Sequence, residues 1–105
     1  MEQPNKSYIH SLSGGDIVFE QKLIDIIKNE FPTEKEVYFN NMAEKKYKPA
    51  ADNVHKLKHK ISILGLEKSY EIAVAFENNL LEGDTNLNTE FESILNTITN
   101  YLQQL

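Results

Sequence analysis

The sequence predicts an all-α protein: an antiparallel up-and-down four-helix bundle with a short N-terminal helix or arm. Apolar residues recur at helical spacing along nearly all of the 105 residues, whereas the alternating runs typical of strands are few. The expected helices are joined by connections of only a few residues, which favours antiparallel neighbours. Because 40% of the residues are apolar, they can supply one modest core, and we expect a single domain over residues 1–105.

The first expected elements are a short helix over residues 7–13, ending at Gly14 and Gly15, and a long helix that Asp16 caps. Pro32 lies within the long helical pattern and removes a backbone donor. We therefore expect one kinked helix that runs to about residue 46, with two separate helices as the alternative. Its expected buried residues are Phe19, Leu23, Ile26, Ile27 and Phe31, then Val37, Tyr38 and Met42.

Three further helices are expected, over about 49–64, 67–81 and 88–104. Pro49 suits the first turn of the first of these helices, and Gly65 suits its C-terminus. The expected inner faces are Val54, Leu57, Ile61 and Leu64, then Leu66, Tyr70, Ala73, Phe76 and Leu80, and finally Phe91, Ile94, Leu95, Ile98, Leu102 and Leu105. These stripes indicate that each helix buries one side.

The helix over residues 49–64 carries a polar stripe opposite its apolar one. The stripe consists of His55, Lys58, His59 and Ser62, spaced i, i+3, i+4 and i+7. We expect these side chains to face water or a partner. A solvated imidazole is largely uncharged near pH 7 and offers a nucleophilic nitrogen. A lysine one turn along would attract and stabilise a phosphoryl group, so the stripe suits receiving and holding phosphate.

The order His-x-Leu-Lys and then Leu-Gly-Leu is similar to the core motif of histidine-containing phosphotransfer (HPt) domains. In this resemblance His55 corresponds to the phosphoacceptor, Lys58 to the phosphoryl-stabilising lysine and Gly65 to the glycine near the helix end. Ser62 and Gly65 are implied to keep this face open to a partner. His59 stands where the family usually has glycine, which suggests altered partner choice, an auxiliary proton donor or a second acceptor, in that order.

The resemblance extends from Gly14-Gly15-Asp16 to Phe76-Glu77, which resembles the apolar-acid pair on the helix after the motif. It implies a phosphorelay intermediate whose partners are response-regulator receiver domains and a hybrid sensor histidine kinase. His55 would take a phosphoryl group from the aspartate of one receiver and pass it to that of another. No cofactor is expected on this chain, because the receiver would supply the divalent cation. A glycine-rich phosphate loop is absent, so we expect a carrier, not an enzyme with ATP-dependent kinase activity.

Composition and charge bear on the binding partners, the cellular location and the oligomeric state. The net charge of −5 argues against binding to nucleic acid or to an anionic membrane, although Lys56, Lys58, His59 and Lys60 form a local basic cluster. No apolar run could span a membrane, and residues 1–6 lead into no signal-peptide core, so we expect a cytoplasmic protein. The initial methionine and the short length favour a free-standing protein. We expect a monomer, because the exposed site that can be recognised is polar.

A non-catalytic helical interaction module, in which the histidines are incidental, is the alternative function, and a metal-binding bundle is a third. His55 and His59 share a helix face, but a metal site needs more ligands, and Lys58 and Lys60 would repel a dication. Lys56 also stands where the metalloprotease pattern His-Glu-x-x-His needs glutamate, so no metal site is expected.

His10 and Phe39 lie outside the motif helix. His10 has no group of chemically related residues around it, and we expect it to be structural or exposed. Phe39 lies off the apolar stripe of its helix together with Asn40, so an exposed ring could contribute to a docking surface. The apolar part of that surface is expected from the helix ending near Tyr47.

Overall fold

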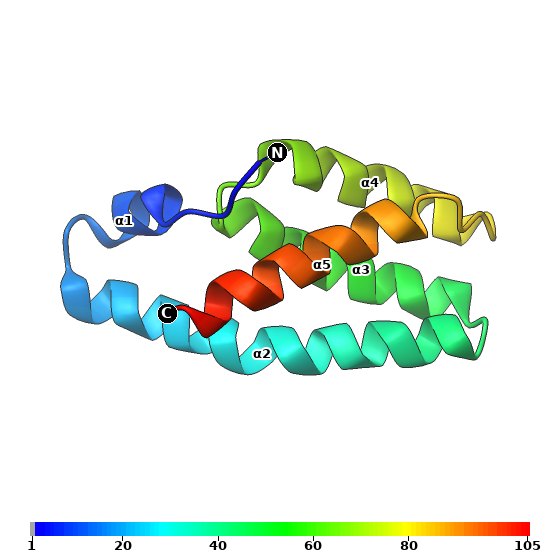
Figure 1. The fold of residues 1–105 in the computed structure, drawn as a ribbon, viewed down its shortest axis with the longest axis horizontal. Coiled ribbons are helices and arrows are strands. Elements are labelled where there is room, and N and C mark those ends of the chain that lie inside the picture. Colours follow the sequence, from blue (N-terminus) through cyan, green and yellow to red (C-terminus); the bar gives the residue numbers. More distant parts are fainter. Residues whose placement is uncertain (1) are drawn as a thin grey trace.

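The computed structural model describes residues 2–105, so only Met1 of the expected domain lies outside it. These residues form helices and no strand, which confirms the all-α prediction. The helices are α1 (Ser7–Ser13), α2 (Ile17–Ala43), α3 (Tyr47–Ile63), α4 (Glu67–Leu81) and α5 (Asn88–Gln103). Figure 1 shows that α2 to α5 reverse direction from one helix to the next, and that α5 crosses the others obliquely. None of the described helices is both long enough and apolar enough to cross a membrane.

Helix α2 continues through Pro32 as one element, so the alternative of two separate helices is wrong. Asp16 caps its start as predicted, because the side chain accepts a hydrogen bond of 3.1 Å from the Phe19 backbone N–H. Proline costs the helix one donor, but Phe31 and Tyr38 on either side of it are almost fully buried. We infer that their packing holds the helix together across the proline.

The buried face of α2 differs in part from the prediction. Ile27, Phe31 and Tyr38 are buried as expected, Leu23 and Met42 only partly, and Ile24 is a buried residue that was not predicted. The predicted core residues that are exposed instead are Phe19, Ile26 and Val37. Figure 1 shows the reason at the N-terminal end, where α2 projects beyond α3 and α5 and only α1 lies alongside it.

The inner faces of α3, α4 and α5 are largely as predicted. Every expected core residue of α3 is buried, and Ala50 and Ala51 join them. In α4 and α5 the exceptions are Tyr70, which is partly buried, and Leu105, which is 37% exposed after the end of α5. Leu105 lies two residues after the last helix ends, so the helical stripe no longer sets the direction of its side chain.

A buried phenol joins three helices at the centre of the core. The Tyr38 ring meets Phe76 of α4 at 6.2 Å and Phe91 of α5 at 5.3 Å between centroids, both edge to face. Its hydroxyl donates a hydrogen bond of 3.0 Å to Oε2 of Glu92. Burial, followed by the charge and hydrogen bond of Glu92, raises the pKa of the Tyr38 phenol.

The segment before α1 crosses the turn between α3 and α4. The Asn5 backbone N–H donates to the Leu64 carbonyl at 2.9 Å. Glu2 reaches the start of α4, where its carboxylate accepts hydrogen bonds from the backbone N–H groups of Lys68 at 2.8 Å and Ser69 at 3.0 Å. Glu2 therefore acts as an N-terminal cap supplied from a distant part of the chain.

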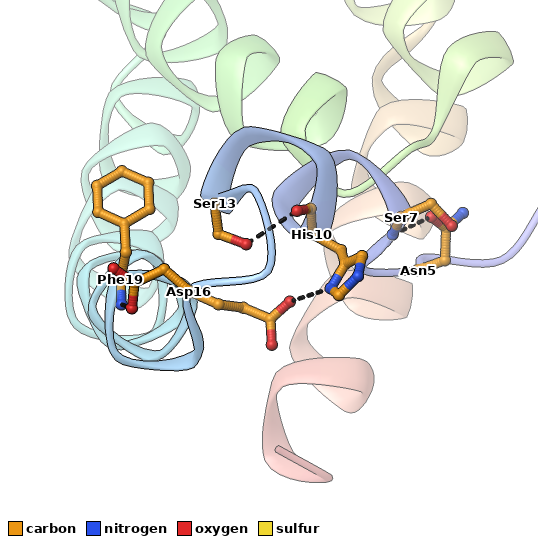
Figure 2. Close-up of polar contacts among 7 residues, drawn as sticks. Asn5, Ser7, His10, Ser13, Asp16 and Phe19 are labelled. Atoms are coloured by element: carbon orange, nitrogen blue, oxygen red, sulfur yellow. Dashed lines mark hydrogen bonds and ion pairs between the residues drawn. The ribbon is translucent and has the colours of Figure 1, made fainter.

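Local polar contacts set the path from the N-terminal segment into α2 (Figure 2). Oδ1 of Asn5 accepts a hydrogen bond from the Ser7 backbone N–H at 3.0 Å, and the Ser13 hydroxyl donates to the His10 carbonyl at 2.8 Å. The His10 ring is exposed, as predicted, and its Nδ1 lies 3.3 Å from Oε1 of Glu20. This pair connects α1 to α2 at the surface.

Candidate functional site

The polar stripe of α3 faces solvent only in part. His55, His59 and Ser62 are exposed, as predicted, because the opposite side of α3 is packed into the core. Lys58 is the exception, with a side chain only 13% exposed. It lies against α4, with its ammonium 6.0 Å from the centroid of the Tyr70 ring. The prediction that Lys58 faces water or a partner is therefore wrong, because its side chain is packed against α4 of the same chain.

His55 is held from the neighbouring helix by Glu77. Its Nδ1 lies 3.2 Å from Oε2 of the carboxylate, and its side chain remains 53% exposed. An ionised carboxylate can only accept, so this contact places the ring hydrogen on Nδ1. In the neutral ring Nε2 then carries the free lone pair and is directed away from the carboxylate. His55 is thus an oriented and accessible imidazole.

The same carboxylate also binds Lys58. The lysine ammonium lies 2.9 Å from Oε1 of Glu77, while Oε2 faces His55. Glu77 is itself mostly covered, with 21% of its side chain exposed. One carboxylate therefore holds both motif residues in a His55–Glu77–Lys58 triad. In the sequence, Glu77 was visible only through the resemblance, because its contacts cross between helices.

His59 stands next to the triad. Its ring lies perpendicular to that of His55, with the centroids 5.0 Å apart. Residues four apart on a helix share a face, which accounts for the contact. Within residues 2–105 the structure shows no hydrogen bond to the His59 ring, so its polar atoms are available to a group placed on His55.

The predicted basic cluster is largely neutralised. Lys60 is 9% exposed, and its ammonium lies 3.0 Å from Oε1 of Glu30 and 2.9 Å from Oε1 of Glu34, both on α2. Burial alone would lower the pKa of Lys60, but the hydrogen bonds and charges of Glu34 and Glu30 outweigh it and hold that pKa above its usual value. With Lys58 bound to Glu77, the two central lysines offer no free patch to an anionic partner.

Gly65 lies at the end of α3, away from the histidines. Ten residues at the rise of an α-helix place it about 15 Å from His55 along the axis. Its φ of +78° is left-handed, and a Cβ atom added here would come within 2.6 Å of Nδ2 of Asn5. In this structure Gly65 therefore serves the turn and the close approach of Asn5.

Apolar side chains are also exposed, in contrast to the polar surface on which the expectation of a monomer rested. Phe39 is 40% exposed, which confirms the prediction of an exposed ring on α2. Others gather around α1 and the start of α2, and the most exposed is Ile17 at 78%. The rest of that group are Tyr8, Leu12, Val18 and Phe19.

The surroundings of His55 determine what the site can do. Within residues 2–105 no group of three or more histidine, cysteine or acidic side chains could hold a metal ion. A groove of about 420 Å³ lies between α4 and α5, but its lining does not include His55. An oriented imidazole on an open helix face suits attack on a group that a partner carries.

No protein-family model, no curated protein and no solved structure matches this chain.

Proposed function

We propose that this chain is a phosphorelay intermediate of a two-component signalling system, built as one HPt-like antiparallel up-and-down four-helix bundle. The observation that carries the proposal is the contact between His55 Nδ1 and Glu77 Oε2 at 3.2 Å, on an imidazole that is half exposed. The contact orients the nucleophile, and the exposure admits a large partner. Both are requirements of a phosphoryl carrier that has no substrate pocket of its own.

The proposed transfer needs no proton to move. The Nε2 lone pair of His55 attacks the phosphorus of a receiver's aspartyl phosphate and forms the N–P bond. The P–O bond to the aspartate breaks, and the carboxylate leaves with its electron pair. Nδ1 keeps its hydrogen, and Glu77 opposes the positive charge that develops on the ring. The reverse sequence delivers the phosphoryl group to a second receiver.

Each predicted site residue has a place in this proposal. His55 is the phosphoacceptor, and Lys58 stabilises the phosphorylated site with a positive charge that Glu77 holds nearby. His59 and Ser62 flank the acceptor on the exposed face. Gly65 flanks it more remotely by shaping the end of α3.

The partners follow from the chemistry of the proposed step. A receiver domain supplies the aspartate and the divalent cation that neutralises the phosphoryl charge, and a hybrid sensor histidine kinase supplies the phosphate upstream. This chain then needs no cofactor and no kinase activity, and it works as a cytoplasmic monomer. The net charge of −5 disfavours nucleic acid and anionic membranes as partners.

Labelling with a small phosphodonor such as phosphoramidate, or with a phosphorylated receiver, tests the proposal. We expect acid-labile, alkali-stable phosphate on the wild type and none on His55→Gln. His10→Gln is the matched control, since His10 is also an exposed histidine beside a glutamate, and it should label normally. Undiminished labelling of the His55 variant would refute the assignment.

The exposed apolar residues favour a second candidate, a non-catalytic helical interaction module. Ile17 and Val18 at the start of α2 are 78% and 67% exposed. Adjacent exposed apolar side chains of this kind are typical of surfaces that bind another protein. In that case the histidines would be incidental. A chain that takes no phosphate from any donor but loses a binding partner on Ile17→Ser would support this candidate.

A further inference from the structure

We propose that His59 is the side chain that directly holds the phosphoryl group on His55, by donating a hydrogen bond to it as an imidazolium. This inference rests on the proposed function, since it concerns the phosphorylated state of His55. It assigns to His59 the contact that the sequence pattern assigns to Lys58. The evidence is the arrangement of the two rings and the pairing of the nearby lysines.

His59 lies beside the acceptor ring on the exposed face of α3. Because Nδ1 of His55 is turned to Glu77, the phosphoryl group is attached at Nε2 and extends away from that carboxylate. The His59 ring lies on the same exposed face, with its centroid 5.0 Å from that of His55. A ring at this distance can place an N–H within hydrogen-bond reach of a phosphoryl oxygen.

The other cations on this helix are less well placed. Lys58 is 13% exposed and bound to Glu77, on the side that Nδ1 faces. Lys60 is 9% exposed and bound to Glu30 and Glu34 of α2. Lys56 is exposed but is adjacent to His55 in sequence, and neighbours at i+1 point to different faces of a helix.

The acidic groups that approach the stripe from the neighbouring helices are already paired with lysine. Glu77 on α4 is bound by Lys58, and Glu30 and Glu34 on α2 are bound by Lys60. Before phosphorylation these carboxylates therefore have a cation other than His59. Asp52 is an exposed carboxylate on α3 itself, but it lies seven residues before His59, about 10 Å away along the helix axis. A phosphoryl group on His55 would lie closer to the His59 ring, and its charge would favour the protonated ring.

Histidine-ring NMR tests this inference on protein phosphorylated with phosphoramidate. Over about pH 5.5 to 8.5, where imidazoles change charge, we expect phosphorylation to move the titration midpoint of the His59 ring upward by about one pH unit. One unit corresponds to about a tenfold preference of the charged ring for the phosphorylated site. His10 is the internal control, because it lies on α1, and its midpoint should stay unchanged.

Substitutions give an independent readout in the lifetime of the phosphohistidine. In His59→Gln and His59→Gly we expect the half-life of phosphorylated His55 near pH 6.5 to fall about tenfold, the effect of losing a charge-assisted hydrogen bond. Lys22→Gln is the matched control, since it removes an exposed positive charge on another helix, α2, and the half-life should change less than about twofold.

The outcomes separate this inference from the proposed function. If His55 takes phosphate but the His59 midpoint and the variant half-lives do not change, the role of His59 is wrong and the carrier function stands. Phosphate found on His59 would overturn the role assigned to it here. If no histidine is labelled, both proposals are wrong.

Discussion

Glu77 binds His55 with one carboxylate oxygen, at 3.2 Å from Nδ1, and leaves the other oxygen for a lysine. The two residues are 22 positions apart and lie on α3 and α4. Helix packing, and not sequence proximity, thus sets the tautomer and direction of the imidazole. We expect the chemistry proposed for His55 to depend on this contact.

Glu77→Gln should weaken that chemistry while preserving the shape of the side chain. The amide can still accept a hydrogen bond but carries no charge to oppose the developing imidazolium. We expect the rate of phosphorylation of His55 by phosphoramidate to fall about tenfold, the size of a lost charge-assisted interaction. Glu71→Gln, an exposed position of the same helix, is the control and should react normally. Equal rates for the two variants would show that Glu77 has no orienting role.

Two glycines with the same backbone conformation isolate the contact of Asn5 with the α3–α4 turn. Gly65 and Gly83 both have φ of +78°, but an added Cβ meets Asn5 at Gly65 and nothing within 4 Å at Gly83. We expect Gly83→Ala to cost about 1 kcal/mol of backbone strain. Gly65→Ala should cost about 0.5 to 1 kcal/mol more, because the end of the Asn5 side chain must move away and give up its hydrogen bond to the Ser7 backbone N–H.

Urea unfolding of the two alanine variants measures this difference in the free energy of unfolding. Adding Asn5→Ala to Gly65→Ala should recover part of the extra cost, which a double-mutant cycle quantifies. Equal destabilisation at both glycines would mean that the Asn5 side chain moves away from the added Cβ atom without a measurable cost in stability.

The protein should lose stability at alkaline pH through Tyr38 and Lys60, and burial raises the pKa of Tyr101 in the same direction. The pKa of Tyr38 is raised by burial and then by Glu92, and that of Lys60 is raised because Glu34 and Glu30 outweigh burial. The unfolded chain therefore releases both protons at a lower pH than the folded chain does. The contribution of these groups to the free energy of unfolding is fully present below about pH 10. It declines as the pH rises above that value, by up to about 1.4 kcal/mol per pH unit for each group.

Urea midpoints measured at a series of alkaline pH values test this expectation. Tyr38→Phe should reduce the dependence on pH, even though it also removes the hydrogen bond to Glu92. Tyr8→Phe is the matched control, since the Tyr8 side chain is 49% exposed and should leave the dependence unchanged. A Tyr38→Phe profile identical to that of the wild type would contradict the role of the buried phenol.

Glu2 should stabilise the start of α4. Burial would raise the pKa of its carboxyl, but the hydrogen bonds from Lys68 and Ser69 outweigh it and hold that pKa below its usual value. The stabilisation is therefore present above the usual glutamate pKa and is lost as the pH falls through the lowered one. Glu2→Ala should cost about 1 kcal/mol, as for other N-terminal caps.

Amide hydrogen exchange tests whether Glu2 stabilises the first turn of α4. The amides of Lys68 and Ser69 should exchange faster in Glu2→Ala than in the wild type, because they lose their acceptor. Gln3→Ala, at the next and exposed position, is the control and should leave both amides protected. Unchanged protection in Glu2→Ala would show that the carboxylate is not the cap.

Helical periodicity was sufficient for most of the fold. The spacing of apolar residues predicted all of the helices, and α4 has the predicted bounds of residues 67–81. It failed where an apolar side chain finds no neighbour to cover it, as for Phe19 and Ile26. A stripe shows which side of a helix can be buried, but the reach of the other helices decides how much of it is.

The candidate site likewise has features that residue spacing predicted and features that depend on helix packing. The sequence by itself determined that His55 and His59 share one exposed face, because residue spacing on a helix sets their relative direction. Only the tertiary structure decided that Lys58 is bound by Glu77 and Lys60 by Glu30 and Glu34. Those carboxylates come from other helices, so their approach depends on packing, which local periodicity does not encode. The tertiary structure thereby placed two lysines of a predicted basic face in ion pairs, beside two accessible imidazoles.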